Sequence, residues 1–356
     1  MNDLAEPKSQ LFDIPVIEHE TSIAISNLNM PDNLYLGEVA GFDLNSEGHM
    51  FVYTRTGEAG DLRYRRSAQL FEFDRNGTFV REIGGPNNYA MGWAHSVRID
   101  REDNIWIVDG GTHLVAKFNR RGQQLMCLGR RPESVGVWGR ADVPGEDRAP
   151  FGMMPEETGQ FYEPTDVAFD NEGNIFVSDG YKNAQVQKFD RDGHFIKRWG
   201  KRGSAPGEFI LPHSIATDRD GRVYVGDRGN NRVQIFDNDG NFISQIKLDI
   251  RLPRDTVFNT AGLPKGKNGI YNSYWPNAVV VSRGPNPTIY TNDTSPSTLI
   301  AFSLDGRIVG RFGEDGRKVG QFGWMHMLAC TEDDDEVYVT ELVNMRVSRV
   351  RIRRPK

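Results

Sequence analysis

Short apolar strands alternate with polar turns along most of the chain. In residues 174–190, NIFVSDGYKNAQVQKFD, apolar and polar positions alternate and are interrupted by a turn rich in Asp, Gly and Asn. A period of two is typical of half-buried strands, and such turns favour hairpins. The composition agrees, with 38 Gly, 18 Pro and 10% aromatic residues. The pattern predicts an all-β protein.

This strand pattern recurs in six related copies with a period of roughly 40–50 residues, which is typical of propeller blades. The two clearest copies begin 48 residues apart, at Pro164 and Pro212. The six copies begin at Val39, His95, Pro164, Pro212, Pro276 and His326. A single copy cannot bury both faces of its sheet, so neighbouring copies must stack. We predict one domain over residues 1–356, a six-bladed β-propeller with its blades in residues 38–352.

Three stretches lie outside the regular copies. Residues 1–37 form an N-terminal segment, and its apolar part at 14–19, IPVIEH, is expected to add the outer strand that the last copy lacks. Such a strand would close the ring and protect the sheet edges. Residues 130–160 and 248–273 are long Gly/Pro-containing connections. Long connections of this kind are either binding loops or plain surface insertions, and both interpretations stay open.

Three of the seven histidines occupy the same position in their copies. His95, His213 and His326 each stand at the start of a first strand, 118 and 113 residues apart, in copies two, four and six. The other copies carry different residues at or near that place: Gly41, Thr165 and Asn277. First strands line the channel of a propeller, and alternate blades of six stand about 120° apart.

The three imidazoles are therefore expected to point at one place on the axis. Three neutral imidazoles with an open position make a catalytic zinc site, although imidazole also binds other borderline metals. Channel histidines satisfied by hydrogen bonds are the alternative interpretation.

Polar side chains also recur at the end of the second strand. Five copies carry a residue there of the kind that ties turns: Asp109, Asp179, Asp227, Asn292 and Glu341. The first copy has Arg55 instead, the third continues into Gly180 and Tyr181, and the fourth continues into Arg228. Loops that follow equivalent strands lie at one end of a propeller, so these side chains are expected to gather around one mouth of the channel.

The copies resemble NHL-repeat propellers, most clearly at residues 179–193 and 227–240. The segments PHSIA, FVSDGYKN, VYTRTG and VGDRGNNR further resemble the peptidyl-α-hydroxyglycine α-amidating lyase family. This resemblance implies a zinc ion held by His95, His213 and His326. It also implies a catalytic Tyr181, with Arg55 and Arg228 binding the substrate. Arg55 is also expected to take part in catalysis, because a neighbouring arginine or the metal would lower the pKa of Tyr181 so that it can act as a base. The family substrate is a carbinolamide, which is cleaved to an amide and glyoxylate.

The chain departs from the family motifs around two of the histidines. Ala94 stands where the family usually has a proline before the first histidine, and the third is set in the run Trp324-Met325-His326-Met327. Met327 replaces an aspartate that helps to bind a structural calcium in the family. The resemblance therefore does not carry calcium over to this chain.

Three functions follow as hypotheses. The first is a zinc-dependent lyase that cleaves the C–N bond of a peptidyl- or N-acyl-α-hydroxyglycine-like carbinolamide. The second keeps the metal but is a hydratase or a lactonase-like hydrolase of a small molecule. In both, a small-molecule or peptide-like substrate is expected in the central channel. The third is a non-enzymatic NHL scaffold that binds a protein through its loops.

Charge and hydropathy narrow the expected partners. The chain has 43 basic and 49 acidic residues, a net charge of −6, which gives no electrostatic reason to expect nucleic acid or an anionic membrane. No apolar run approaches the length of a membrane span. No apolar signal segment is visible at the N-terminus, and the two cysteines, Cys127 and Cys330, lie far apart. A cytoplasmic protein is therefore expected.

Overall fold

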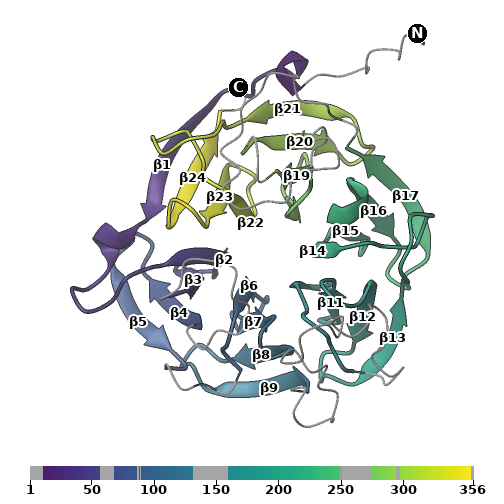
Figure 1. Ribbon diagram of the computed structural model, residues 1–356, viewed down its shortest axis with the longest axis horizontal. Coiled ribbons are helices and arrows are strands. Elements are labelled where there is room, and N and C mark those ends of the chain that lie inside the picture. Colours follow the sequence, from purple (N-terminus) through teal and green to yellow (C-terminus); the bar gives the residue numbers. More distant parts are fainter. Residues whose placement is uncertain are drawn as a thin grey trace, which may run out of the picture.

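The protein consists of six four-stranded antiparallel sheets arranged around a common axis (Figure 1). The structure, a computed structural model, describes the following residues: 11–56, 68–85, 88, 90–130, 159–248, 250, 275–293 and 297–353. Regular structure in these residues is almost entirely strand, with three single-turn 3-10 helices, η1 (Leu11–Asp13), η2 (Asn27–Asn29) and η3 (Arg228–Asn230). The predicted all-β, six-bladed propeller is confirmed.

Five blades follow the chain in order, each running from an inner to an outer strand. Blades 1, 2 and 3 are β2 (Glu38–Leu44), β3 (Met50–Arg55), β4 (Ala68–Phe73), β5 (Phe79–Ile83); β6 (Ala94–Ile99), β7 (Ile105–Asp109), β8 (Leu114–Phe118), β9 (Gln124–Gly129); and β10 (Asp166–Phe169), β11 (Ile175–Asp179), β12 (Gln185–Phe189), β13 (Phe195–Trp199). Blades 4 and 5 are β14 (Pro212–Thr217), β15 (Val223–Asp227), β16 (Arg232–Phe236), β17 (Phe242–Lys247); and β18 (Val279–Val281), β19 (Thr288–Asn292), β20 (Leu299–Ser303), β21 (Ile308–Phe312). The two predicted long connections, 130–160 and 248–273, lie almost wholly outside the described residues.

Blade 6 joins the two ends of the described chain. It contains β22 (Met325–Cys330), β23 (Glu336–Glu341), β24 (Arg346–Ile352) and the N-terminal β1 (His19–Ile25). The outermost strand, β1, pairs antiparallel with β24, starting with His19 opposite Ile352. Figure 1 shows this closure as purple β1 beside yellow β24.

Closure by an N-terminal strand was expected, but its predicted position at 14–19 was wrong. The residues before β1 lie instead along β21 of blade 5, where the Ile17 amide donates to the Arg311 carbonyl and the Arg311 amide donates to the Pro15 carbonyl. Pro15 has no N–H to donate, so this segment cannot continue as a regular ladder. The seven-residue β1 has no proline and pairs with β24 from His19 to Ile25, with one irregularity between Ile23 and Ile25.

The hydrophobic core lies between neighbouring blades. Second strands such as β7 and β15 are buried at every position, whereas the outer strand β13 has no fully buried residue. The inner strands of blades 1 and 2 approach so closely that a Cβ added at Gly41 would lie 2.5 Å from the Val97 amide nitrogen. Among the described residues no helix is long and apolar enough to cross a membrane.

A buried ionic network ties the inner strands together near the axis. Arg98 of β6 donates from Nε and Nη2 to the two carboxylate oxygens of Asp166 on β10, at 2.9 and 2.7 Å. Its Nη1 donates to the Leu328 carbonyl of β22 at 2.7 Å. Asp166 also accepts the Ile215 amide of β14, and Asp43 of β2 accepts the Ile99 amide beside Arg98. Five of the six blades thus share one polar cluster.

Candidate metal centre

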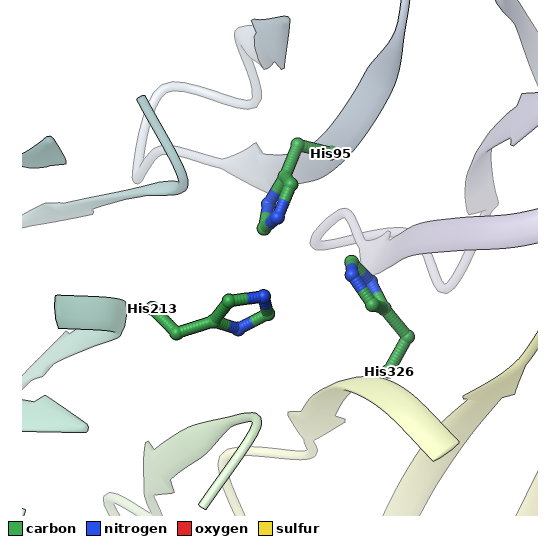
Figure 2. A group of neighbouring side chains, drawn as sticks. All are labelled: His95, His213 and His326. Atoms are coloured by element: carbon green, nitrogen blue, oxygen red, sulfur yellow. The ribbon is translucent and has the colours of Figure 1, made fainter. Parts of the chain in front are cut away.

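The three histidines come from the inner strands of alternate blades and face one another (Figure 2). One ring nitrogen from each of His95, His213 and His326 lies within 4.8 Å of the others. The ring centroids are separated by 4.7–5.3 Å. The sequence predicted that these three side chains would meet on the propeller axis, and the observed geometry agrees with that prediction.

A break in strand pairing accompanies each histidine. The ladder between β6 and β7 shifts between Ala94 and Ser96, which skips His95. The ladders of blades 4 and 6 shift in the same way around His213 and His326. A β-bulge bends the strand and re-aims the side chain that it contains. The bulges therefore explain how residues of an inner strand turn toward the axis.

The histidine rings are oriented by carbonyl groups of the intervening blades. Nδ1 of His95 lies 2.5 Å from the Thr165 carbonyl, that of His213 lies 2.7 Å from the Asn277 carbonyl, and that of His326 lies 2.6 Å from the Ala40 carbonyl. A carbonyl only accepts, so each Nδ1 carries the proton and donates it. Each Nε2 then keeps its lone pair for the axis, as metal-ligating histidines require.

Burial keeps the three imidazoles neutral. His95 and His213 are fully buried and His326 is 3% exposed. Burial, the largest cause, lowers the pKa of each histidine well below its usual value, and the positive charges of Arg55 and Arg228 lower the pKa of His213 and His326 further. The pKa of His95 is likewise lowered by burial and then by its histidine neighbours and Arg55. Neutral imidazoles are the form that binds a metal.

The donor set fits a borderline divalent metal. Three neutral Nε2 atoms converge from three directions, and the Tyr181 hydroxyl lies 3.1 Å from Nε2 of His95 and 3.0 Å from Nε2 of His213. Zinc accepts such a set of three imidazoles and one open position, as do other metals that favour imidazole. By contrast, Met327 offers no oxygen ligand to calcium, and its side chain is buried in the apolar cluster of blades 5 and 6.

Carboxylates at the ends of the second strands hold the loops that precede the histidines. Asp109 accepts the amides of Gly92 and Trp93, both at 2.8 Å. Asp227 accepts the Ile210 amide at 3.0 Å in front of His213. Glu341 of blade 6 accepts the amide of Gly323 at 2.8 Å in front of His326. The prediction that these residues tie turns is confirmed, and the turns are those that position the histidines.

Arg55 lies beside the histidine cluster. Its Nε donates to the Ala94 carbonyl at 2.9 Å, and its Nη1 is 3.5 Å from the carboxylate of Glu38. Its guanidinium stacks on the ring of Trp93, 4.3 Å from the centroid. The Trp93 ring is also 5.6 Å from that of Tyr181 and 5.8 Å from that of His95, between centroids. The structure thus brings Arg55 and Tyr181 together around the histidines.

Arg228 reaches the same mouth from blade 4. It opens η3 directly after β15, and its positive charge acts on His213 and His326. Its guanidinium lies 5.7 Å from the ring centroid of Trp275. The arginine–tryptophan pairs were missed in the sequence. A signal was present, because Trp93 and Trp275 each stand two residues before the register position of the histidines in their blades.

Fold and site together define a six-bladed β-propeller with a three-histidine centre in its channel. A family model described as a 6-bladed beta-propeller matches residues 158–273. The chain is 32% identical over 236 residues to peptidyl-glycine alpha-amidating monooxygenase A of Xenopus laevis, which covers 60% of this chain and 23% of the relative. It is 27% identical over 345 residues to peptidyl-alpha-hydroxyglycine alpha-amidating lyase 1 of Drosophila melanogaster, with 89% and 58% covered.

Other similar proteins carry different names. NHL repeat-containing protein 3 of Mus musculus is 31% identical over 180 residues, with 48% of this chain and 46% of the relative covered. The chain therefore spans less than three fifths of the length of these curated relatives. Virginiamycin B lyase of Staphylococcus aureus superposes with a TM-score of 0.56 at 10% identity, covering 94% of this chain and all of that one. A gluconolactonase of Xanthomonas campestris gives 0.57 at 12% identity, with 96% and 95% covered. At these identities the two structures show the fold alone.

Proposed function

We propose that this protein is a metal-dependent lyase that cleaves the C–N bond of an N-acyl- or peptidyl-α-hydroxyglycine-like carbinolamide. The observation that carries the proposal is the Tyr181 hydroxyl, within 3.1 Å of Nε2 of both His95 and His213. A phenol at the open side of a three-imidazole site can exchange a proton with a substrate bound there. The similarity of this chain to two proteins named peptidyl-alpha-hydroxyglycine alpha-amidating lyase supports a lyase reaction of the same class.

The cationic groups at this mouth suit the carboxylate end of such a substrate. Arg55 and Arg228 are presented from blades 1 and 4, and both act electrostatically on His213 and His326. A guanidinium binds a carboxylate through two parallel hydrogen bonds. The Arg55 guanidinium lies over the Trp93 ring and that of Arg228 over the Trp275 ring, 4.3 and 5.7 Å from the centroids, within the range of cation–π attraction. The substrate carboxylate would then fix the carbinol carbon close to Tyr181.

The cleavage balances without any further reactant. Tyr181, in its ionised form, accepts the proton of the carbinol hydroxyl. The oxygen electrons form the carbonyl, the C–N bond breaks, and its electrons pass to the amide nitrogen. The proton then moves from the Tyr181 hydroxyl to that nitrogen, which gives an amide and glyoxylate. A divalent metal held by His95, His213 and His326 would supply Lewis-acid polarisation of the substrate oxygen.

A lactonase-like hydrolase or hydratase is the second candidate. The observation that favours it is the apolar surrounding of His326, with Met325 and Met327 both fully buried on either side. These neighbours differ from the amidating-lyase motif, so a different substrate is compatible with the same three histidines. A hydrolase would open a lactone to a hydroxy acid and would release no aldehyde from an α-hydroxyglycine compound.

Metal analysis combined with one substrate separates these hypotheses. The purified protein is expected to contain one equivalent of metal, which His213→Ala loses and the control His19→Ala, on the outer strand β1, keeps. α-Hydroxyhippurate should then yield benzamide and glyoxylate in equal amounts. Metal without glyoxylate would favour the hydrolase, and the absence of bound metal would contradict both enzymes and favour a scaffold.

Tyr181→Phe tests the assigned proton transfer. Loss of a positioned acid–base group costs about 10²–10⁴-fold in kcat, whereas metal content should stay unchanged. Tyr35→Phe is the matched control, because this tyrosine is 50% exposed and lies outside the site. A Tyr181→Phe variant with wild-type kcat would show that another group moves the proton.

A further inference from the structure

A second cavity lies at the opposite end of the inner strands from the histidines. Its volume is about 880 Å³, and every blade contributes to its lining. In blade 2, for example, His95 begins β6 whereas Arg98 and Ile99, which line the cavity, end it. The proposed function uses no residue of this cavity.

Three arginines from blades 2, 4 and 5 line this cavity. Arg101 follows β6, Arg219 follows β14 and Arg283 follows β18, and all three line the cavity. Asn171 of blade 3 connects the first two, since its Oδ1 accepts from Arg101 and its Nδ2 donates to the Arg219 carbonyl. The guanidinium groups are close enough that burial first, and then Arg101 and Arg219, lower the pKa of Arg283.

Some side-chain donors of Arg283 make no hydrogen bond to the described residues. Its side-chain hydrogen bonds come from Nη2 alone, to the Thr217 hydroxyl at 3.2 Å and the Phe169 carbonyl at 3.5 Å. Over the described ranges none of the three cavity arginines takes part in an ion pair. Arg101 and Arg219 are exposed, but Arg283 is partly buried, and burying a guanidinium without a counter-charge is unfavourable. Because Arg283 lines the cavity, its Nε and Nη1 donors are available to a ligand bound there.

The carboxylates around the same cavity already have donors. Asp100 accepts from Lys117 and Trp106, and Asp103 pairs with Arg120. Asp43 accepts the backbone amides of Leu44 and Ile99. Asp333 accepts the hydroxyl of Thr331.

The remaining acidic side chain is Glu332. It is exposed, and its charge raises the pKa of Arg283 without an ion pair between the two. Five arginines and five carboxylates line the cavity. Arg98 is paired with Asp166, Asp100 with Lys117 and Asp103 with Arg120, so four lining arginines remain against three lining carboxylates.

We propose that this second mouth binds a small multivalent anion bearing phosphate or carboxylate groups through Arg283, Arg219 and Arg101. Guanidinium groups bind both kinds of oxyanion in the same bidentate geometry. A cavity of about 880 Å³ accommodates such an ion with part of its hydration shell. The site is distinct from the metal centre. The Arg98–Asp166 ion pair lies farther along the inner strands than the histidines, between them and the cavity arginines.

Isothermal titration calorimetry with inorganic phosphate and with succinate tests the proposal at constant ionic strength. We expect saturable binding of one ion per chain, and the tighter of the two probes identifies the group that is recognised. Arg283→Gln should weaken binding at least about tenfold, since hydrogen bonds to charged groups are strong. Arg219→Gln and Arg101→Gln, at exposed positions, should each weaken it less and serve if Arg283→Gln does not fold. Glu332→Gln should strengthen binding.

Two controls decide where the ion binds. Arg307→Gln removes an exposed arginine that pairs only with its neighbour Asp305, and should leave binding unchanged. The double variant His213→Ala/Arg228→Gln disables the metal centre and the carboxylate-binding arginine beside it, and should leave the binding that Arg283→Gln weakens unchanged. The absence of saturable binding, equal binding in Arg283→Gln, or loss of that binding in His213→Ala/Arg228→Gln would each overturn the proposal.

Discussion

Replacing Arg98 by methionine should destabilise the propeller strongly. Arg98 and Asp166 form a bidentate ion pair in which the Asp166 side chain is fully buried and that of Arg98 is 10% exposed. Burial alone would lower the pKa of Arg98, but the attraction of Asp166 outweighs it, so the net shift is upward. Methionine retains the volume of the side chain but provides no charge and no donor.

The expected loss follows from the unpaired carboxylate that remains. Breaking a buried ion pair by removing one partner costs about 3–5 kcal/mol. Asp166 would keep only the amides of Val167, at 3.0 Å, and Ile215, at 3.3 Å. Arg98 lines the cavity at the opposite end of the inner strands from the histidines, so water can reach the vacated position. We therefore expect a loss in the lower half of the range of about 3–5 kcal/mol. For a chain of this size the change in Tm should be about 5–10 °C.

Thermal unfolding followed by circular dichroism measures this effect. Asp166→Asn is then added to Arg98→Met, because the neutral amide removes the buried charge and its carbonyl still accepts one amide. The double variant should recover at least half of the lost stability. A shift below about 1 °C for Arg98→Met would refute the importance of the pair, and a double variant less stable than the single one would refute the proposed cause.

Two further predictions concern Asp179 and Gly41. Burial raises the pKa of Asp179 to about 6 despite hydrogen bonds from Asn183, Tyr162 and Gln185, so ionisation opposes folding, and stability falls as pH rises from about 4 to 6. Asp179→Asn should remove this pH dependence and raise the free energy of unfolding at pH 7 by up to about 3 kcal/mol over wild type. Urea unfolding midpoints of both proteins at pH 4.5 and 7 measure this difference. Parallel pH profiles for the two proteins would contradict the prediction. Gly41→Ala should cost about 1–3 kcal/mol, since its Cβ meets the backbone of Ser96 and Val97 at 2.5–2.8 Å, and an unchanged Tm would show that the blades can separate freely.

The repeat made the fold and the histidine cluster predictable from the sequence. Six copies in register placed His95, His213 and His326 on alternate inner strands, and a closed ring then required them to face the axis. The acidic residues after the second strands were predictable for the same reason. Each of these inferences depends only on the position of a residue within its own copy.

Side-chain contacts between different copies could not be predicted from the sequence. Arg98 pairs with a residue 68 positions away and donates to a carbonyl 230 positions away, and no periodicity indicates such partners. The same holds for the stacking of Arg55 on Trp93. The closing strand was misplaced because IPVIEH is more apolar than β1, although Pro15 prevents a regular ladder there.

The closure of blade 6 by β1 has a consequence for the order of folding. Nδ1 of His326 donates to the Ala40 carbonyl, and this bond crosses the boundary between blade 6 and blade 1, the blades farthest apart in sequence. On the ribosome, blades 1 to 5 can assemble as they emerge, but β22, β23 and β24 come last. The third imidazole therefore takes its place only after nearly the whole described chain has been made. Under the proposed function, a metal could be bound by all three histidines only when synthesis is almost finished, and a product truncated before β22 would have only His95 and His213 in position.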